Sequence, residues 1–309
     1  MFETLETGAG LDIVLALQSM RSGLLDALAI LLDAMGSPVF FLLILLLVYW
    51  SVDRKLGTRL IFALLVVGIA NTAMKDLLAR PRPAAVSDQV IALTDPYGYG
   101  IPSGHVMIAL VVAGYVAVYL HRRWGFWVVA AYVVLMAWAR MYAGVHYPQD
   151  VVAAIIFGLI TLWLFVRVAE PVAARWIGMN PALKVGIIML AGVITALLLA
   201  SDPTGSALAG LMIGLGPALE LEKRYVDFGT QGSRRQRAAR YLAGTVLALI
   251  LFVGLRVLFG SLAEEGEFLF DLLRVVRYAL VALFAGFIWP LLALRLDILS
   301  VQVPESDHV

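Results

Sequence analysis

The chain has 309 residues, of which 62% are hydrophobic and only 15% are charged, and its mean hydropathy is +0.92. Soluble domains average about 45–50% apolar and about 25% charged residues, so the composition indicates an all-α, polytopic membrane protein. The formal net charge of +1 provides no bulk attraction to nucleic acid. The absence of cysteine excludes disulfides, thiolate nucleophiles and cysteine-based metal sites.

The first predicted element is the segment Leu11–Met35, where short apolar runs alternate with charges. These charges are Asp12, Arg21, Asp26 and Asp33. We expect one or two amphipathic helices that lie at the membrane interface, and a tenth membrane span is the alternative.

Nine further segments approach the roughly 20 apolar residues that a helix needs to cross a bilayer. Several are short, so we expect their ends to extend into the flanking residues. They are Pro38–Val52, Leu60–Leu78, Ser103–Leu120, Phe126–Arg140, Asp150–Val166, Lys184–Ala200, Gly205–Leu219, Tyr241–Gly260 and Val275–Leu296. The predicted organisation is an N-terminal amphipathic segment over residues 1–36, a motif-bearing membrane core over 37–170, and additional C-terminal helices with a short tail over 171–309.

Small residues mark one of the later segments. Gly210 and Gly214 have the GxxxG spacing, which lets two helix backbones approach closely. Packing against another helix of the same chain is one interpretation of this pattern. A homodimer through the same helix face is the other.

Basic residues predict the orientation, because loops rich in Lys and Arg stay on the cytoplasmic side. With the predicted spans, one side of the membrane receives Arg54, Lys55, Arg59, Arg122, Arg123, Arg167, Arg175, Lys184, Lys223, Arg224, Arg234, Arg235, Arg237 and Arg240. We therefore expect this side, with the C-terminus, to be cytoplasmic. The plasma or inner membrane is the expected location, and the opposite face is then periplasmic or extracellular.

Three blocks of polar residues fall on that opposite face. They are Lys75 with Arg82-Pro83, then Pro102-Ser103-Gly104-His105, then Arg140 with His146 and Asp150. Charged groups are costly in an apolar chain, so their grouping at the ends of spans indicates a chemical site.

The cations of these blocks suit a phosphate. Arg82 and Arg140 can form forked hydrogen bonds, and Lys75 adds a point charge. Ser103 and Gly104 open a helix whose free N–H groups can bind an anion. A single basic residue near a helix end is usually an interface anchor, but three such residues in one site favour a phosphate-binding role.

The histidines add catalytic chemistry to this anion site. Asp150 stands four residues after His146 and can orient its ring, although a carboxylate in a first helical turn is also an ordinary stabilising feature. His105 lies in the second block. Two histidines and one carboxylate could also ligate zinc, but the three neighbouring cations would oppose a dication, so no metal is expected.

These residues resemble the signature of the type-2 phosphatidic acid phosphatase superfamily, which includes lipid phosphatases, glucose-6-phosphatases and vanadium haloperoxidases. The signature reads Lys-x6-Arg-Pro, then Pro-Ser-Gly-His, then Ser-Arg-x5-His-x3-Asp, and the match covers about residues 60–168. Ala139 stands where the signature has serine, which removes one hydroxyl contact to phosphate.

The resemblance implies a role for each matched residue. His146 would be the nucleophile that forms a phosphohistidine, with Asp150 orienting it. His105 would protonate the leaving oxygen and then activate the water that hydrolyses the intermediate. The phosphate would be held by Lys75, Arg82, Ser103, Gly104 and Arg140. A six-helix phosphatase core without metal or cofactor is also implied.

The expected function is therefore metal-independent hydrolysis of a phosphate or diphosphate ester of a membrane lipid, such as a polyprenyl diphosphate or phosphatidic acid. One alternative keeps the histidine chemistry in a lipid phosphotransferase or a phosphatase for a soluble sugar phosphate. Another alternative is a non-catalytic phospholipid carrier. The pair of histidines argues against a carrier, because anion binding alone needs neither a nucleophile nor an acid.

Overall fold

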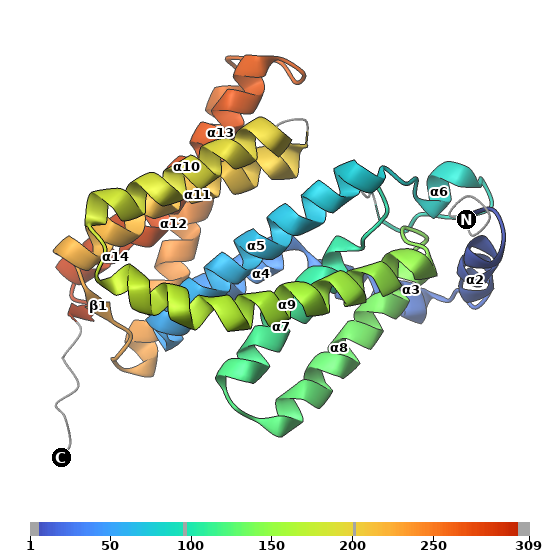
Figure 1. Cartoon of the computed structure of the whole chain (residues 1–309), viewed down its shortest axis with the longest axis horizontal. Coiled ribbons are helices and arrows are strands. Elements are labelled where there is room, and N and C mark those ends of the chain that lie inside the picture. Colours follow the sequence, from blue (N-terminus) through green and yellow to red (C-terminus); the bar gives the residue numbers. More distant parts are fainter. Residues whose placement is uncertain (1–5, 95–97, 200–201, 302–309) are drawn as a thin grey trace. The chain divides into compact units, whose positions relative to one another are not determined.

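The computed structural model describes residues 6–94, 98–199 and 202–301, and most of them are helical (Figure 1). Two very short strands, β1 (Phe228–Gly229) and β2 (Ser300–Val301), pair in antiparallel fashion. Residue 200, which ends one predicted span, and the predicted cytoplasmic tail after residue 301 lie outside the described part.

Each predicted span coincides with a helix over its described residues, and most of these helices extend beyond the predicted ends. The earlier ones are α4 (Pro38–Leu47) with the π-helical turn η1 (Val48–Val52), α5 (Arg54–Leu78), α7 (Gly104–Tyr119), α8 (Arg123–Tyr142) and α9 (Pro148–Ile177). The later ones are α10 (Pro181–Leu199), α11 (Pro203–Tyr225), α12 (Arg234–Gly260), and α13 (Phe268–Leu283) with η2 (Phe284–Ile288) and α14 (Trp289–Arg295).

Within the described residues, seven helices are long and apolar enough to cross a membrane, and one bent pair of shorter helices would make an eighth. The segments Pro38–Val52 and Gly104–Tyr119 are apolar but shorter. The all-α, multi-pass membrane architecture predicted from sequence is thus confirmed, whereas the number of nine spans stays a prediction.

The bent pair is the N-terminal segment, which folds as α2 (Ala9–Gln18) and α3 (Gly23–Gly36) at 119° to each other. Side chains fasten it to the end of α8. Gln18 Nε2 donates to the Tyr142 carbonyl at 3.1 Å, and the Tyr142 hydroxyl donates to Asp26 at 2.7 Å. The structure therefore has two helices here, and their location at the membrane interface stays a prediction.

Prolines begin many of the helices. A proline suits the first helical turn because its missing N–H would have no partner there and its φ is already helical. In the described part of the chain, α4, α6 (Pro83–Val86), α9, α10 and α11 begin at Pro38, Pro83, Pro148, Pro181 and Pro203. Three of the predicted spans, which began at Asp150, Lys184 and Gly205, therefore start two or three residues after the helices do.

The chain divides into two compact units. Over the described residues, unit 1 holds residues up to Leu42 together with Phe62–Glu170, and unit 2 holds Leu43–Ile61 together with residues from Pro171 onward. In unit 1, α7 packs against α8, and α3 packs against both. Unit 1 contains every predicted site residue.

In unit 2, α11 packs against α10 and α13. A Cβ atom at Gly210 would collide with the carbonyl oxygen of Val275, and one at Gly214 with that of Ala279. Both glycines therefore let α11 and α13 approach closely, so the GxxxG pattern is used within the chain.

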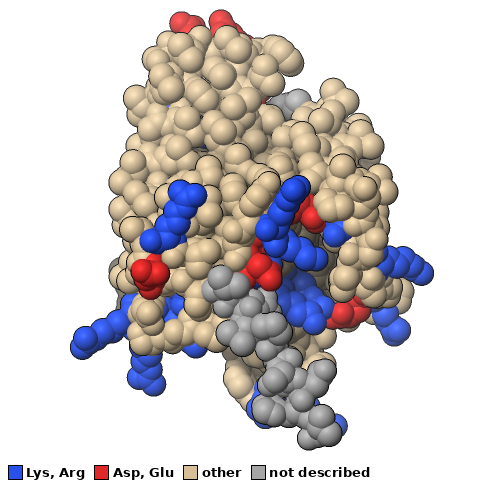
Figure 2. Space-filling view, turned by 90° about the vertical axis from the view of Figure 1, so that its left-hand side faces the viewer, with Lys and Arg blue, Asp and Glu red and all other residues tan. Residues whose placement is uncertain are grey.

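Exposed cations of unit 2 gather at the end of α11 and the start of α12. They are Lys223, Arg224, Arg234, Arg235 and Arg237. On the face shown in Figure 2, most Lys and Arg side chains and several Asp or Glu side chains lie in one part of the surface, and a broad area carries almost no charge. A broad uncharged area is expected of a membrane protein.

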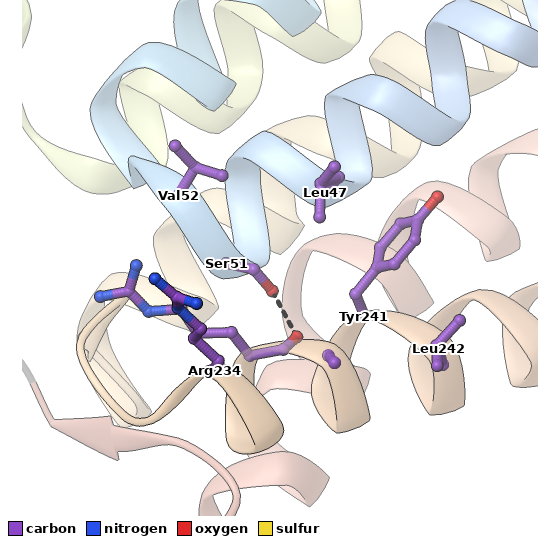
Figure 3. Close-up of a pocket in the computed structure, with 8 residues that line it drawn as sticks. Leu47, Ser51, Val52, Arg234, Tyr241 and Leu242 are labelled. Carbon is purple, nitrogen blue, oxygen red and sulfur yellow. Dashed lines mark hydrogen bonds between the residues drawn. The ribbon is translucent and has the colours of Figure 1, made fainter.

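A groove in unit 2 lies between η1 and the start of α12 (Figure 3). Apolar side chains, including Leu47 and Leu242, line part of it. The Ser51 hydroxyl donates to the Arg237 carbonyl at 3.0 Å. This bond ties the π-helical turn to the first turns of α12.

Candidate active site

Helix ends position the first two motif blocks. Lys75 is in the last turn of α5, and Arg82 is the N-cap residue of α6. Ser103 is the N-cap residue of α7, so Gly104 and His105 are its first two helical residues. The apolar segments form the helices, and the polar residues of the site lie at the helix ends.

The third block joins α8 to α9. Arg140 is in the last turn of α8, His146 is in the linker, and Asp150 is in the first turn of α9. The Asp150 Oδ2 atom accepts from the backbone N–H of Tyr147 at 2.9 Å and lies 3.2 Å from His146 Nδ1. Both side chains are buried.

The two ring nitrogens of His146 have different partners. Nε2 lies 3.1 Å from Arg82 Nη1. Because a guanidinium can only donate, this nitrogen must be the acceptor, and we assign the ring proton to Nδ1, which then donates to Asp150. The Nε2 lone pair therefore points toward the cationic side of the site.

The surroundings of His146 favour its neutral form. Burial lowers the pKa of this imidazole well below its usual value of 6.5, and the positive charges of Arg82, Arg140 and Lys75 lower it further. A neutral imidazole retains a lone pair at neutral pH. The ring is thus in the protonation state that a nucleophile requires.

Backbone carbonyls hold the two cations of the first block. The loop after α6 accepts from both, with Gly98 O at 2.8 Å from Arg82 Nε and Tyr99 O at 2.7 Å from Lys75 Nζ. Arg82 Nη1 also donates to Val145 O at 2.9 Å. These bonds fix the positions of both cations.

The start of α7 is tightly packed. The Ser103 N–H donates to the Asp150 carbonyl at 3.1 Å, which joins the second block to the third. A Cβ at Gly104 would lie 3.1 Å from Asn71 Oδ1, so glycine gives this turn room. Within the described part of the chain, the buried Ser103 hydroxyl has no hydrogen-bond partner, so it remains available to a ligand.

Arg140 and His105 meet a carboxylate that sequence reasoning did not assign to the site. Asp33 of α3 forms an ion pair with Arg140 Nη1, and its same oxygen lies 3.4 Å from His105 Nε2. The only sequence signal for Asp33 was a charge within an apolar helix, which is costly without a partner. Nothing in its spacing pointed to these two residues.

Ala139, at the position where the signature has serine, packs away from charged groups. It is buried in an apolar cluster with Ala29 and Leu32 of α3 and with Tyr142. In this chain α3 therefore covers the position from which a serine hydroxyl would have acted.

Two family descriptions match the sequence. Residues 56–172 match the PAP2 superfamily, and residues 206–301 match the transmembrane extension of PAP2 superfamily phosphatases. Together these matches cover more than half of the chain, and the first contains all the residues of the three motif blocks.

The individual relatives share only a modest fraction of identical residues with this chain. The chain is 26% identical to lipid phosphate phosphatase delta of Arabidopsis thaliana, over 52% of this chain and 42% of that protein. It is 30% identical to undecaprenyl-diphosphatase of Sulfolobus acidocaldarius, over 40% of this chain and 60% of that protein. Among solved structures, LpxE of Aquifex aeolicus is 25% identical with a TM-score of 0.46, over 52% of this chain and 96% of that one.

The aligned region thus spans less than half of the Arabidopsis relative. The family matches are broader, and they agree with the ordered signature and with the helical membrane architecture. The chain is a multi-pass integral membrane protein that belongs to the PAP2 superfamily.

Proposed function

We propose that this protein hydrolyses a phosphate or diphosphate ester of a membrane lipid through a phosphohistidine at His146. The observation that carries the proposal is the pairing of His146. Its Nδ1 lies against Asp150, and its Nε2 lone pair points toward Arg82. This arrangement combines an oriented nucleophile with a cationic site for the phosphate.

In the first step, the Nε2 lone pair attacks phosphorus, and the bond to the lipid oxygen breaks. The leaving oxygen takes a proton from His105, so the lipid product departs as an alcohol or, from a diphosphate, as a monophosphate. Lys75, Arg82 and Arg140 offset the negative charge of the phosphoryl oxygens. The Ser103 hydroxyl and the N–H groups at the start of α7 supply further donors.

In the second step, His105 accepts a proton from water, and the water oxygen attacks the phosphorus of phosphohistidine. The N–P bond breaks, inorganic phosphate leaves, and the lone pair returns to Nε2. Asp150 keeps the proton on Nδ1 throughout.

The proposal also assigns the active site to one side of the membrane. The exposed cations at the end of α11 and the start of α12 support a cytoplasmic location for the loop that joins these helices and for the C-terminal end. The site at the other end of α5 from Arg54 then lies on the exoplasmic face of the plasma or inner membrane. A phosphate at headgroup depth could reach it while the lipid tail stays in the bilayer.

The names of the relatives support a lipid substrate. One is a lipid phosphate phosphatase and another an undecaprenyl-diphosphatase. The proposed substrate class is therefore an amphiphile such as a polyprenyl diphosphate, phosphatidic acid or a long-chain-base phosphate.

The test is phosphate release by the purified chain in detergent containing EDTA. The substrates are a polyprenyl diphosphate, phosphatidic acid, a long-chain-base phosphate and glucose 6-phosphate. His146→Ala should abolish release, whereas His121→Ala, which removes an exposed histidine outside the site, should not. Equal release by the wild type and His146→Ala would overturn the proposed chemistry.

Two further arms separate the alternatives. Transfer of phosphate to an added acceptor lipid, in place of release, would indicate a phosphotransferase. Loss of activity in EDTA and its recovery with zinc would indicate a metal enzyme.

A further inference from the structure

Asp33 contacts two of the residues that the proposed function assigns to the phosphate, Arg140 and His105. One oxygen atom of this carboxylate contacts both Arg140 Nη1 and His105 Nε2. In the proposed reaction, the same arginine binds the phosphate and the same histidine protonates the leaving oxygen. A carboxylate and a phosphate group cannot both be there, because they would overlap and repel.

The packing of α3 brings Asp33 to this place. At the end of α3, a Cβ on Gly36 would lie 2.6 Å from His105 Cδ2 and 2.8 Å from Met136 Cε, so the helix lies directly against α7 and α8. The Asp33 side chain is nevertheless 24% exposed, compared with 3% for Arg140. The carboxylate can therefore turn away while the helix stays in place.

The carboxylate satisfies the site incompletely. Among the described residues, Arg140 Nε and the Ser103 hydroxyl are buried and have no hydrogen-bond partner. A phosphate group has more oxygen atoms than a carboxylate, so it can accept hydrogen bonds from more of these donors.

We infer that Asp33 is the resident counter-ion of the phosphate subsite and that the substrate phosphate displaces it from Arg140 and His105. This inference rests on the proposed function for its substrate, but not for the binding of phosphate itself. Asp33 stabilises the cationic site when it is empty and lowers its affinity for every phosphate ligand.

The test measures the affinity of the full-length chain in detergent for inorganic phosphate, by calorimetry or by the rise in Tm. Asp33→Asn removes the charge and keeps the size, so it should bind phosphate on the order of tenfold more tightly, since a like charge at about 4 Å is removed. Asp33→Glu retains the charge and should not gain affinity. If Asp33→Asn fails to fold, Asp33→Ser replaces it in the same comparison.

Asp26→Asn is the matched control. Asp26 lies about two turns earlier on the same helix and pairs with Arg21 and the Tyr142 hydroxyl, away from the phosphate subsite. The Asp26→Asn variant should bind phosphate with the affinity of the wild type. An equal gain in Asp26→Asn would mean that any lost negative charge has this effect, and would overturn the inference.

Steady-state kinetics separate displacement from simple positioning of His105. The inference expects a lower KM in Asp33→Asn. A lower kcat with unchanged phosphate affinity would show that Asp33 only positions the histidine, and would overturn the inference. If neither protein hydrolyses any lipid phosphate, the proposed function fails, and the binding measurement still decides the role of Asp33.

Discussion

His146 Nδ1 and Asp150 Oδ2 lie 3.2 Å apart within one buried turn, and the same carboxylate oxygen accepts from the Tyr147 N–H. The backbone N–H of Tyr147 therefore fixes the position of the carboxylate that orients the His146 ring. Such a pair selects the tautomer in which Nε2 carries the lone pair.

Asp150→Asn should lower kcat by roughly a thousandfold, because an amide can donate to Nδ1 and shift the proton to Nε2. Trapping the intermediate with radiolabelled phosphate would report the loss directly. Asp88→Asn, at an exposed carboxylate, serves as control. Normal labelling of Asp150→Asn would show that Asp150 does not set the tautomer.

Acid should destabilise the fold through His146, which lies in the linker between α8 and α9. Its pKa is lowered in the folded protein, first by burial and then by Arg82, Arg140 and Lys75. Below a pH of about 6.5 the unfolded chain binds a proton here that the folded chain does not. The contribution of His146 to the free energy of unfolding should then fall by up to about 1.4 kcal/mol per pH unit until its folded pKa is reached.

Thermal unfolding between pH 7.5 and 5 checks this expectation. Relative to the wild type, His146→Gln should gain Tm as the pH falls, because the residue no longer titrates. His121→Gln, at an exposed histidine, should retain the wild-type slope. Identical slopes for His146→Gln and the wild type would place the acid sensitivity elsewhere.

Arg82→Lys should reduce kcat/KM on the order of a hundredfold. The guanidinium contacts Gly98 O, Val145 O and His146 Nε2 with two of its nitrogens, and a single ammonium cannot span the same acceptors. Arg80→Lys is the matched control, since Arg80 forms an ion pair with Glu6 outside the site. Comparable losses in both variants would argue against a specific role for Arg82.

Gly214→Ala should lower Tm, because the new methyl group would meet the backbone of Ala279 on α13. Overpacking of this kind typically costs about 1–3 kcal/mol. Gly254→Ala on α12 meets nothing within 4 Å and should be neutral or slightly stabilising, since alanine favours helix. A Tm as high for Gly214→Ala as for Gly254→Ala would contradict the tight packing of α11 on α13.

Much of the architecture was readable from local patterns. Long apolar runs predicted the helices, and prolines such as Pro148 and Pro203 coincide with helix starts. These features depend on residues that are close in sequence, because helix formation and capping are local. The sequence likewise predicted the contact of His146 with Asp150, because a helix that begins near Pro148 places Asp150 in its first turn, close to the preceding linker.

Only the tertiary structure decided which distant residues meet. The pairing of Asp33 with Arg140 and His105 depends on the packing of α3 against α7 and α8, and no periodicity within α3 reveals its partner. The GxxxG pattern of α11 also allowed two interpretations, and the structure has α13 against it. Such contacts depend on helix packing across long stretches of chain, where side-chain shape and charge select one partner among several apolar faces.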